Sequence, residues 1–455
     1  MRLTWSLLLS AGCALGFGAC ASVVPPDLEF AAARCQTVYD DGVEGMPTFE
    51  LGAILSVTKP DGNPDDAGVF ETRAMQLAIQ ELNDHRDVAG KRFRLRVCDT
   101  RADWSVGGGK VTTDLTKWLI EHGKVQAILS DASSDTQTIQ AVTVPRGVLV
   151  MAISATSGEL TNLADKGLVW RVAPSDVYQG AVLAHAVSST VAETDAVAVL
   201  AVQSPYGDSL VDALGKHLGK RLSAHTFGTD GKGFDSALQA AALAKPKALI
   251  VIGNAPLAMQ VANARAAIPA LANVGLFLSD GACDGELVKQ TKAAGVSLAG
   301  ARCTRPGHPP TPIYDHFRER FQQRFAADPA QSSYTEHAYD AVYSVALAHA
   351  WALRQGGEGK VDGIALAEGL RHLAKGPAHP YKPSEITAMI ANLGKGQAID
   401  VEGASGPLDF NPDTGEAPSA YEAWTLGAGG ELLAKQYFSV LDQGGKVVVV
   451  EASGK

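Results

Sequence analysis

The sequence predicts an α/β protein made of two doubly wound lobes of parallel β-sheet, joined by a hinge that the chain crosses more than once. Apolar, strand-like runs alternate with helical segments from Phe49 to Ser279 with few interruptions. The alternation forms two successive series, which fit two similar lobes better than one very large sheet. No low-complexity linker separates the series, so short connections must act as the hinge.

The first series supplies the elements of the first lobe. Residues 69–83 show the helical pattern, because Phe70, Ala74, Leu77 and Leu82 recur at the spacing of one helix face. A second helix is expected at residues 111–122. Strands are expected at residues 49–57, 93–99, 125–129, 148–153 and 168–172.

The second series and the tail complete the predicted organisation. Helices are expected at residues 179–187, 209–218, 234–244 and 257–266, and strands at 196–202, 224–227, 248–253 and 274–279. Two long helices, 314–326 and 336–354, precede short strands and a last strand at 446–451. We therefore expect a signal peptide (1–20), an amino-terminal extension (21–48), lobe 1 (49–172 and 304–385), lobe 2 (173–303 and 386–430) and extra carboxyl-terminal strands (431–455).

Composition narrows the class of protein. The chain has 455 residues, of which 46% are hydrophobic and 19% charged, as is typical of a globular protein with a substantial core. The net charge of -10 and the lack of Lys/Arg runs argue against nucleic acid or an anionic membrane surface as the main partner.

The amino terminus predicts export. Residues 1–20 carry one positive charge, an apolar middle and small residues at the end, which is the pattern of a secretory signal peptide. Phe17-Gly-Ala-Cys20 resembles the bacterial lipobox, which predicts lipidation of Cys20 and a periplasmic protein that contacts the membrane through its lipid anchor only. Cys13 is a weaker candidate, and an ordinary cleaved signal peptide with an incidental Cys20 is the alternative.

Four cysteines lie beyond the predicted signal peptide. An even number of cysteines in an oxidising compartment predicts disulfides, and four allow three pairings. Cys283 and Cys303 flank one predicted helix near the ends of two strands, so we favour that pair, with Cys35 joined to Cys98. A zinc site is the competing interpretation, but the close cysteine spacing and histidine cluster that zinc needs are absent from the sequence.

Polar residues follow four of the predicted strands. Residues 130–136 and 154–157 are rich in small hydroxyl side chains, and each stretch follows a short apolar run. Tyr206 and Asp280 follow strands of the second series. Because ligands of open α/β sheets bind at the carboxyl ends of strands, these residues predict a site for a small polar molecule. The alternatives are helix caps for the hydroxyl residues and Asp280, and a packing tyrosine in a turn.

The order of these motifs resembles that of the type I periplasmic binding proteins of the leucine/isoleucine/valine-binding family, which are the extracytoplasmic receptors of ABC importers. Matching features include Glu81-Leu-Asn-Asp84, Ser133-Ser-Asp-Thr136, Ser154-Ala-Thr156, Tyr206-Gly207 and Gly406-Pro-Leu-Asp-Phe410. The resemblance extends from about Leu51 to about Leu426. It implies a hinged binder without turnover, a small polar ligand that is an amino acid or a related amide or acid, and an ABC permease as partner.

The resemblance also implies a ligand-binding set drawn from both lobes: Ser133, Ser134, Ser154, Ala155, Thr156, Tyr206 and Asp280. The first-lobe groups would receive the α-carboxylate of an amino acid, Tyr206 would close over the ligand, and Asp280 would pair with the α-ammonium. Two positions depart from the family pattern. Asn254 stands where relatives often have an aromatic residue, and Asp131 adds a carboxylate that would repel an anionic ligand.

Three other functions are compatible with parts of the sequence. A sensory or scaffold lipoprotein would use the same fold without transport, and a lipid or sterol carrier would need an apolar cleft, whereas these strand ends are hydroxyl-rich. A hydrolase is disfavoured, because the sequence contains neither a Gly-x-Ser-x-Gly nor a His-Glu-x-x-His motif. The sequence therefore predicts a receptor with no catalytic residue, cofactor or metal.

Overall fold

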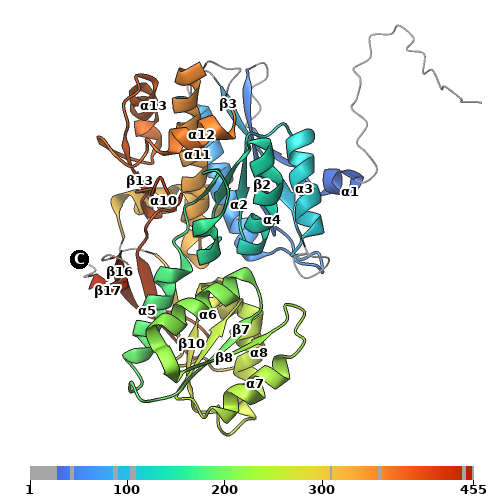
Figure 1. The fold of residues 1–455 in the computed structure, drawn as a ribbon, viewed down its shortest axis with the longest axis vertical. Helices are drawn as coiled ribbons and strands as arrows, with labels where there is room; N and C mark the ends of the chain where they lie inside the picture. The colour runs from blue at the N-terminus through green and yellow to red at the C-terminus, as the bar shows by residue number, and fades with distance from the viewer. Residues whose placement is uncertain are drawn as a thin grey trace, which may run out of the picture.

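The structure is a computed structural model that describes residues 28–40, 46–85, 91–102, 109–307, 310–356, 361–442 and 447–452. These residues form two lobes that follow one another along the long axis of the molecule (Figure 1). A parallel sheet lies in the middle of each lobe, and helices cover both of its faces, which confirms the predicted fold class. The predicted signal peptide and Cys20 lie outside the described residues.

The sheet of lobe 1 has six strands in the order β1-β3-β2-β4-β5-β6. The β1–β3 pair is antiparallel and the other pairs are parallel. Every residue of β4, β5 and β6 is buried, as expected for strands covered on both faces. The bounds are β1 Thr37–Tyr39, β2 Thr48–Leu55, β3 Arg92–Asp99, β4 Ala127–Ser130, β5 Leu149–Ala152 and β6 Val169–Arg171.

Alternate side chains of β2 reach the two helical layers of lobe 1. Leu51 and Leu55 belong to the larger core, under α2 and α11, whereas Ile54 packs with Leu115 and Leu119 of α3. The helices are α1 Glu29–Arg34, α2 Asp66–Asp84, α3 Lys110–Glu121, α4 Ser133–Thr143, α10 Pro312–Phe325, α11 Thr335–Gly356, α12 Gly363–Leu370 and α13 Ile386–Gly394.

Lobe 2 contains an eight-stranded sheet in the order β17-β16-β15-β11-β10-β9-β7-β8. Its five parallel strands are β7 Val197–Val202, β8 Leu222–Phe227, β9 Ala248–Ile252, β10 Gly275–Leu278 and β11 Arg302–Pro306. Three antiparallel strands extend it: β15 Tyr421–Leu426, β16 Leu432–Asp442 and β17 Val447–Ala452. Its helices are α5 Asp176–Ser188, α6 Pro205–Leu218, α7 Phe234–Leu243, α8 Ala255–Ala266 and α9 Gly285–Ala294.

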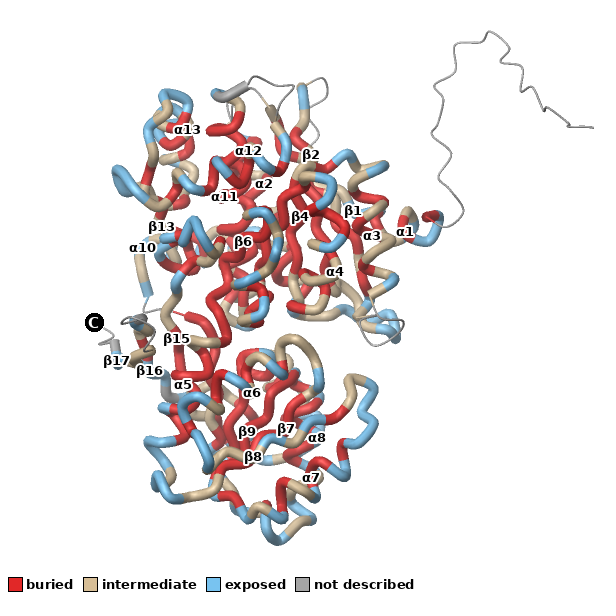
Figure 2. Tube along the Cα trace, viewed as in Figure 1, coloured by how far each residue is buried: buried red, intermediate tan, exposed pale blue. Residues whose placement is uncertain are grey.

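The parallel strands of both lobes share one order, β3-β2-β4-β5-β6 in lobe 1 and β8-β7-β9-β10-β11 in lobe 2. In each lobe the strand order therefore reverses at one point, which lies between β2 and β4 in lobe 1 and between β7 and β9 in lobe 2. Ligands of such sheets bind at this point, beyond the carboxyl ends of the strands. Figure 2 shows the buried strands leading toward the junction of the lobes.

The structure places the lobe boundaries differently from the sequence-based prediction. Residues 386–430 were expected in lobe 2, but Met389, Val401 and Phe410 belong to the core of lobe 1. In that region β12 Ala378–Pro380, β13 Asp400–Gly403 and β14 Gly406–Pro407 form a small separate sheet. Conversely, residues 304–306 were expected in lobe 1 and lie in β11 of lobe 2. The helix α13 packs on α11, a long-range contact that local periodicity does not reveal.

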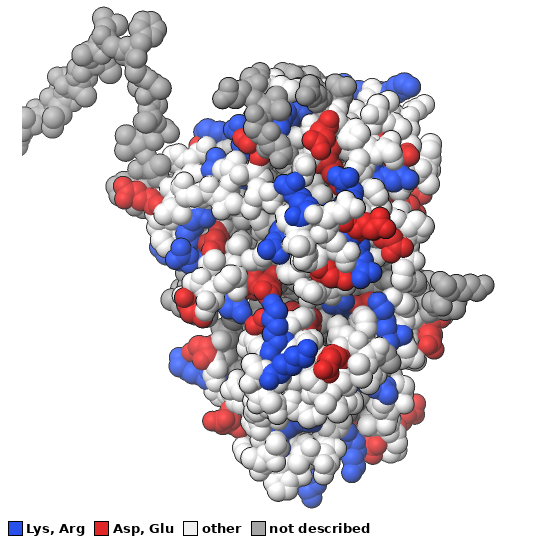
Figure 3. All heavy atoms as spheres, turned by 180° about the vertical axis from the view of Figure 1, so that it is seen from behind, with Lys and Arg blue, Asp and Glu red and all other residues white. Residues whose placement is uncertain are grey.

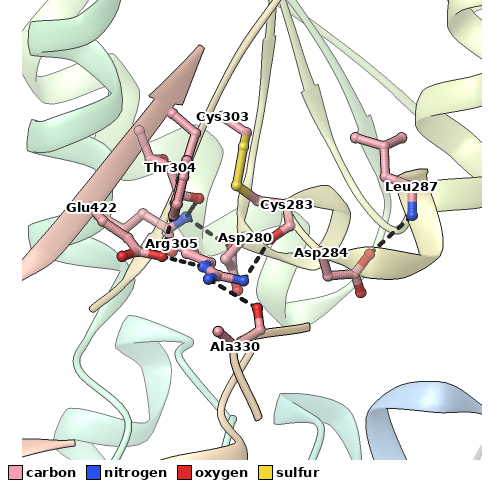
Figure 4. The surroundings of a disulfide bond; sticks show 11 residues. Asp280, Cys283, Asp284, Leu287, Cys303, Thr304, Arg305, Ala330 and Glu422 are labelled. Carbon is pink, nitrogen blue, oxygen red and sulfur yellow. Dashed lines mark hydrogen bonds and ion pairs between the residues drawn. A yellow bond between two sulfur atoms is a disulfide. The ribbon is translucent and has the colours of Figure 1, made fainter. Parts of the chain in front are cut away.

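Both favoured disulfides are present. Cys35 is bonded to Cys98, which ties the amino-terminal extension to β3, and Cys283 is bonded to Cys303, next to β10 and in β11. The second bond lies beside the loop that carries Asp280 (Figure 4). In the part of the chain that the structure describes, no helix is both long and apolar enough to cross a membrane.

Replacing Cys35 and Cys98 together with alanine should lower the free energy of unfolding by roughly 4 kcal/mol, because this disulfide constrains a sequence separation of 63 residues in the unfolded chain. The same double replacement at Cys283 and Cys303, which are 20 residues apart, should cost roughly 3 kcal/mol. Urea unfolding of the oxidised proteins measures both losses. A smaller loss for the Cys35–Cys98 pair than for the other would contradict the loop-closure argument.

Candidate functional site

The segment after β5 is held in place by the guanidinium of Arg171, at the end of β6. Arg171 is 2% exposed, and its Nη1 donates hydrogen bonds to the carbonyl oxygens of Ala155 (3.2 Å) and Ser157 (2.8 Å). Its Nη2 forms an ion pair with Glu416 and donates to the hydroxyl of Thr161 (3.2 Å). Because the guanidinium donors have a fixed planar geometry, these contacts fix the backbone of residues 155–157.

The predicted first-lobe residues surround this segment. Ser133 is the first residue of α4, and its Oγ accepts a hydrogen bond from the amide of Ser157 (3.1 Å). The carbonyl oxygen of Thr156 accepts from the amide of Asp176 (2.7 Å). The Thr156 hydroxyl is buried and has no hydrogen-bond partner among the described residues. Ser134 follows on α4 and is half-buried, and its carbonyl oxygen accepts from Thr138 within the helix.

The same segment joins the two lobes. The Ser157 hydroxyl donates to the carbonyl oxygen of Pro205 (2.9 Å), and the amide of Gly158 donates to Ser209 Oγ (2.7 Å), so the segment contacts the first turns of α6. Two ion pairs also cross between the lobes: Lys59–Glu286 (3.0 Å) and Lys289–Asp66. Figure 3 shows side chains of both charges gathered at the waist between the lobes.

Asp280, at the end of β10, is held by three donors. The Tyr206 hydroxyl and Gln179 Nε2 donate to its Oδ1 (2.6 and 2.9 Å), and the Tyr334 hydroxyl donates to its Oδ2 (2.6 Å). Tyr334 has a φ of 64°, a left-handed conformation that is uncommon outside glycine. Burial and the charge of Asp280 raise the pKa of both tyrosines well above the usual value, so both remain hydrogen-bond donors.

Asp176 was not singled out in the sequence, yet it has an unusual environment. It is fully buried in the first turn of α5, and neither carboxylate oxygen has a hydrogen-bond partner among the described residues. Burial and then the nearby charge of Asp280 raise the pKa of Asp176 to about 7. The charge of Arg171 and the hydroxyls of Thr156 and Ser209, which lie close to Asp176 without meeting hydrogen-bond geometry, lower it in part. The sequence feature that could have indicated Asp176 is an acidic residue shortly after Arg171, at the end of the connection that leads from β6 to α5.

A second pair of carboxylates lies on the lobe 1 side. Glu71 of α2 is 3% exposed and lies beside Ser154, and Asp131 follows β4 and accepts hydrogen bonds from the amides of Ser56 (2.9 Å) and Ala132 (2.5 Å). Burial and then the charge of Asp131 raise the pKa of Glu71 well above the usual value. Burial and the neighbouring Asp135 raise the pKa of Asp131 to about 7. No sequence pattern indicated Glu71, which lies within an ordinary helical pattern.

We call the Asp176, Asp280, Glu71 and Asp131 carboxylates, with residues 154–157, the interlobe site. It contains Ser154, Ala155 and Thr156, and contacts Ser133 and Tyr206. Asn254, the predicted departure, caps α8 by accepting a hydrogen bond from the amide of Leu257 (3.2 Å). In the described ranges, no group of three or more His, Cys, Asp or Glu residues could hold a metal ion.

The repeated strand order and the facing strand ends define a two-lobed binding-protein fold. A family model described as periplasmic binding protein matches residues 50–423, most of the chain. The chain therefore belongs to the periplasmic binding protein family, as the motif resemblance had indicated. No match was found among curated proteins.

Solved structures show the same type I fold. The leucine binding protein LivK from Thermotoga maritima has a TM-score of 0.66 at 20% identity, over 86% of this chain and 98% of LivK. A second similar structure is that of the branched-chain amino acid transporter substrate binding protein LivJ from Streptococcus pneumoniae in complex with isoleucine. Its TM-score is 0.66 at 18% identity, over 89% of this chain and 100% of LivJ. A third is that of a solute binding protein of an ABC transporter from Rhodopseudomonas palustris in complex with 3,4-dihydroxy benzoic acid. Its TM-score is 0.61 at 16% identity, over 89% of this chain and 96% of that protein.

Glu416→Gln should lower the free energy of unfolding by about 3 kcal/mol, because it leaves the buried guanidinium of Arg171 without its counter-charge. Chemical denaturation measures the loss. Glu368→Gln is the matched control, because Glu368 is exposed and pairs with a partly exposed Arg371. Equal stability of the two variants would show that the Arg171–Glu416 pair does not hold the site.

The stability of the ligand-free protein should decrease as pH rises from 4 to 7. A carboxyl whose folded-state pKa is raised binds more protons in the folded state, so the stability it contributes is present below the unfolded pKa and is lost as pH rises through the folded value. For Asp176, with a folded pKa of about 7, the effect is on the order of 4 kcal/mol. Unfolding of wild type and Asp176→Asn across this range isolates it, and identical pH profiles would contradict the assignment.

Proposed function

We propose that this chain is an extracytoplasmic solute-binding receptor, which captures a small ligand bearing an ammonium group between its lobes and delivers it to an ABC importer. The observation that carries the proposal is the buried carboxylate of Asp176, whose oxygens have no hydrogen-bond partner among the described residues. An ammonium group supplies both the positive charge and the hydrogen-bond donors that such a carboxylate requires.

The ligand contacts come from both lobes. The hydroxyls of Ser133 and Thr156 and the backbone of residues 154–156 are suited to the carboxylate of an amino acid or the carbonyl of an amide. Asp176 receives the ammonium group, and Tyr206 lies against the ligand from α6. Because one ligand then bridges the lobes, binding stabilises the closed arrangement in which residues 157 and 158 meet α6.

Asp280 has a different task from the one that the family resemblance implied. Its two oxygens already accept three hydrogen bonds, from Tyr206, Gln179 and Tyr334. We propose that Asp280 adds negative charge beside the ammonium and fixes Tyr206, while Asp176 makes the direct contact. Ser134 completes the first turn of α4, where it supports Ser133.

The proposal also includes the extracytoplasmic location of the protein and its partner, an ABC importer. The pattern of residues 1–20 supports export and a lipid anchor at Cys20. The importer partner is supported by family membership and by relatives whose names describe them as ABC transporter or branched-chain amino acid transporter binding proteins.

A thermal-shift panel of amino acids, amides, small carboxylates and lipids tests the proposal on the mature protein. We expect compounds with an ammonium group to raise the melting temperature. For the best of these, Asp176→Asn should weaken binding by about 1.5–3 kcal/mol in calorimetry, and Thr156→Val should also weaken it. Asp235→Asn, on the exposed face of α7, is the matched control.

Three outcomes would contradict the proposed function. Unchanged affinity in both Asp176→Asn and Thr156→Val would show that the ligand binds elsewhere. A response confined to lipids would favour a carrier, and turnover of a bound compound by the purified protein would favour an enzyme.

A further inference from the structure

We infer that the ligand is a small organic dication, with one cationic group bound by Asp176 beside Asp280 and a second bound by Glu71 and Asp131. The inference rests on the proposed function, because it concerns the chemistry of the same interlobe site. It goes further by assigning a charge to the part of the ligand that lies against lobe 1.

The two carboxylate pairs lie beside the same short segment of chain. Glu71 lies beside Ser154, and Asp176 lies beside Thr156. Because Ser154 and Thr156 are two residues apart, their Cα atoms are separated by at most about 7 Å. A chain of a few carbon atoms spans this length, so one ligand can place a cationic group at each pair.

Buried acceptors without donors provide an independent indication of a ligand. Both oxygens of Asp176 and the side-chain carbonyl oxygen of Gln179 are buried, and in the described part of the chain none has a hydrogen-bond partner. The Thr156 hydroxyl beside Asp176 is also unpaired, and it can supply one donor, which leaves the other acceptors for a ligand. These acceptors require hydrogen-bond donors, which ammonium and guanidinium groups carry in excess.

The nearby basic side chains of the protein are already paired. Arg171 pairs with Glu416, Arg305 with Glu422, and Lys59 with Glu286. Arg305 also donates to the carbonyl oxygens of Cys283 (3.0 Å) and Ala330 (3.3 Å), as Figure 4 shows. The interlobe site therefore holds four acidic side chains, and none of them forms an ion pair with a basic side chain of the described residues.

The lobe 1 pair also disfavours an aliphatic ligand. Glu71 is buried, and Asp131 and Asp65 both lie close enough to add to the negative charge around it. An apolar side chain placed there would exclude water from these carboxyls and offer them no hydrogen bonds, which is costly for buried polar groups. A second cationic group on the ligand removes this cost and makes the site selective by charge.

Four compounds separate the contribution of the second cationic group from that of a carboxylate. L-Lysine and L-norleucine both carry an α-carboxylate, and only lysine has a side-chain ammonium. Cadaverine and n-pentylamine both lack the carboxylate, and only cadaverine has two ammonium groups. We call the compound with two ammonium groups the dication of its pair and the compound with one ammonium group the monocation, whatever the net charge. Calorimetric titration of the wild-type protein should show that the dication of each pair binds at least tenfold more tightly than its monocation.

Charge-neutralising variants assign the effect to residues. Glu71→Gln and Asp131→Asn should each reduce the preference for the dication, by about tenfold, with little change for the monocation. Glu193→Gln and Asp235→Asn, at exposed positions, are the matched controls. The circular dichroism spectrum and melting temperature of each variant show that it is folded.

The outcomes distinguish this inference from the proposed function. Tighter binding of lysine than of cadaverine identifies a basic amino acid as the ligand class, and the reverse identifies a diamine. Equal or tighter binding of the monocations overturns the inference and leaves the proposed function standing. A preference for dications that persists in both lobe 1 variants also overturns it. If none of these four compounds and no member of the wider panel binds, both proposals fail.

Discussion

The buried guanidinium of Arg171 is the interaction on which the arrangement of the site depends. Arg171 is the last residue of β6. Its guanidinium donates hydrogen bonds to the carbonyl oxygens of Ala155 and Ser157 and forms an ion pair with Glu416. One side chain thus connects a strand of lobe 1, the segment that meets lobe 2, and the stretch of chain that leads toward β15. A lysine could not make these contacts together, because only the planar guanidinium presents several donors in fixed directions.

The basic side chains near the interlobe site form ion pairs with other acidic residues, so the site itself is acidic. Burial raises the pKa values of Asp176 and Asp131 to about 7, so the folded, ligand-free protein carries carboxyls that are unfavourable when ionised. Under the proposal made above, a cationic ligand removes that cost only when both lobes surround it. The same electrostatic term therefore contributes to ligand affinity and to closure, because a ligand shifts a conformational equilibrium by its difference in affinity for the two states.

The sequence predicted those features that local patterns encode. Alternating apolar runs gave the two parallel sheets, and hydroxyl residues after β4 and β5 indicated the edge where the lobes meet. Glu71 was missed because it fits an ordinary helical pattern, and Asp176 because it lies in a connection just before a predicted helix. The significance of both arises only from burial and from neighbours distant in sequence. The misplacement of residues 386–417 has the same origin, since α13 shows no local sign that it packs on α11.

The fold of this protein and the ligand specificity that we propose for it therefore have separate physical origins. The fold is shared with relatives at 20% identity or less, and two of their solved structures contain ligands as different as isoleucine and 3,4-dihydroxy benzoic acid. Such a range is possible because the strand order fixes where a ligand lies, whereas the side chains at the strand ends fix what it must be. In this chain those side chains include Asp131 at the end of β4 and Asp280 at the end of β10, with Glu71 and Asp176 contributed by adjacent helices. The charge of these four residues, rather than the likeness of the backbone, is the feature from which the ligand class can be inferred.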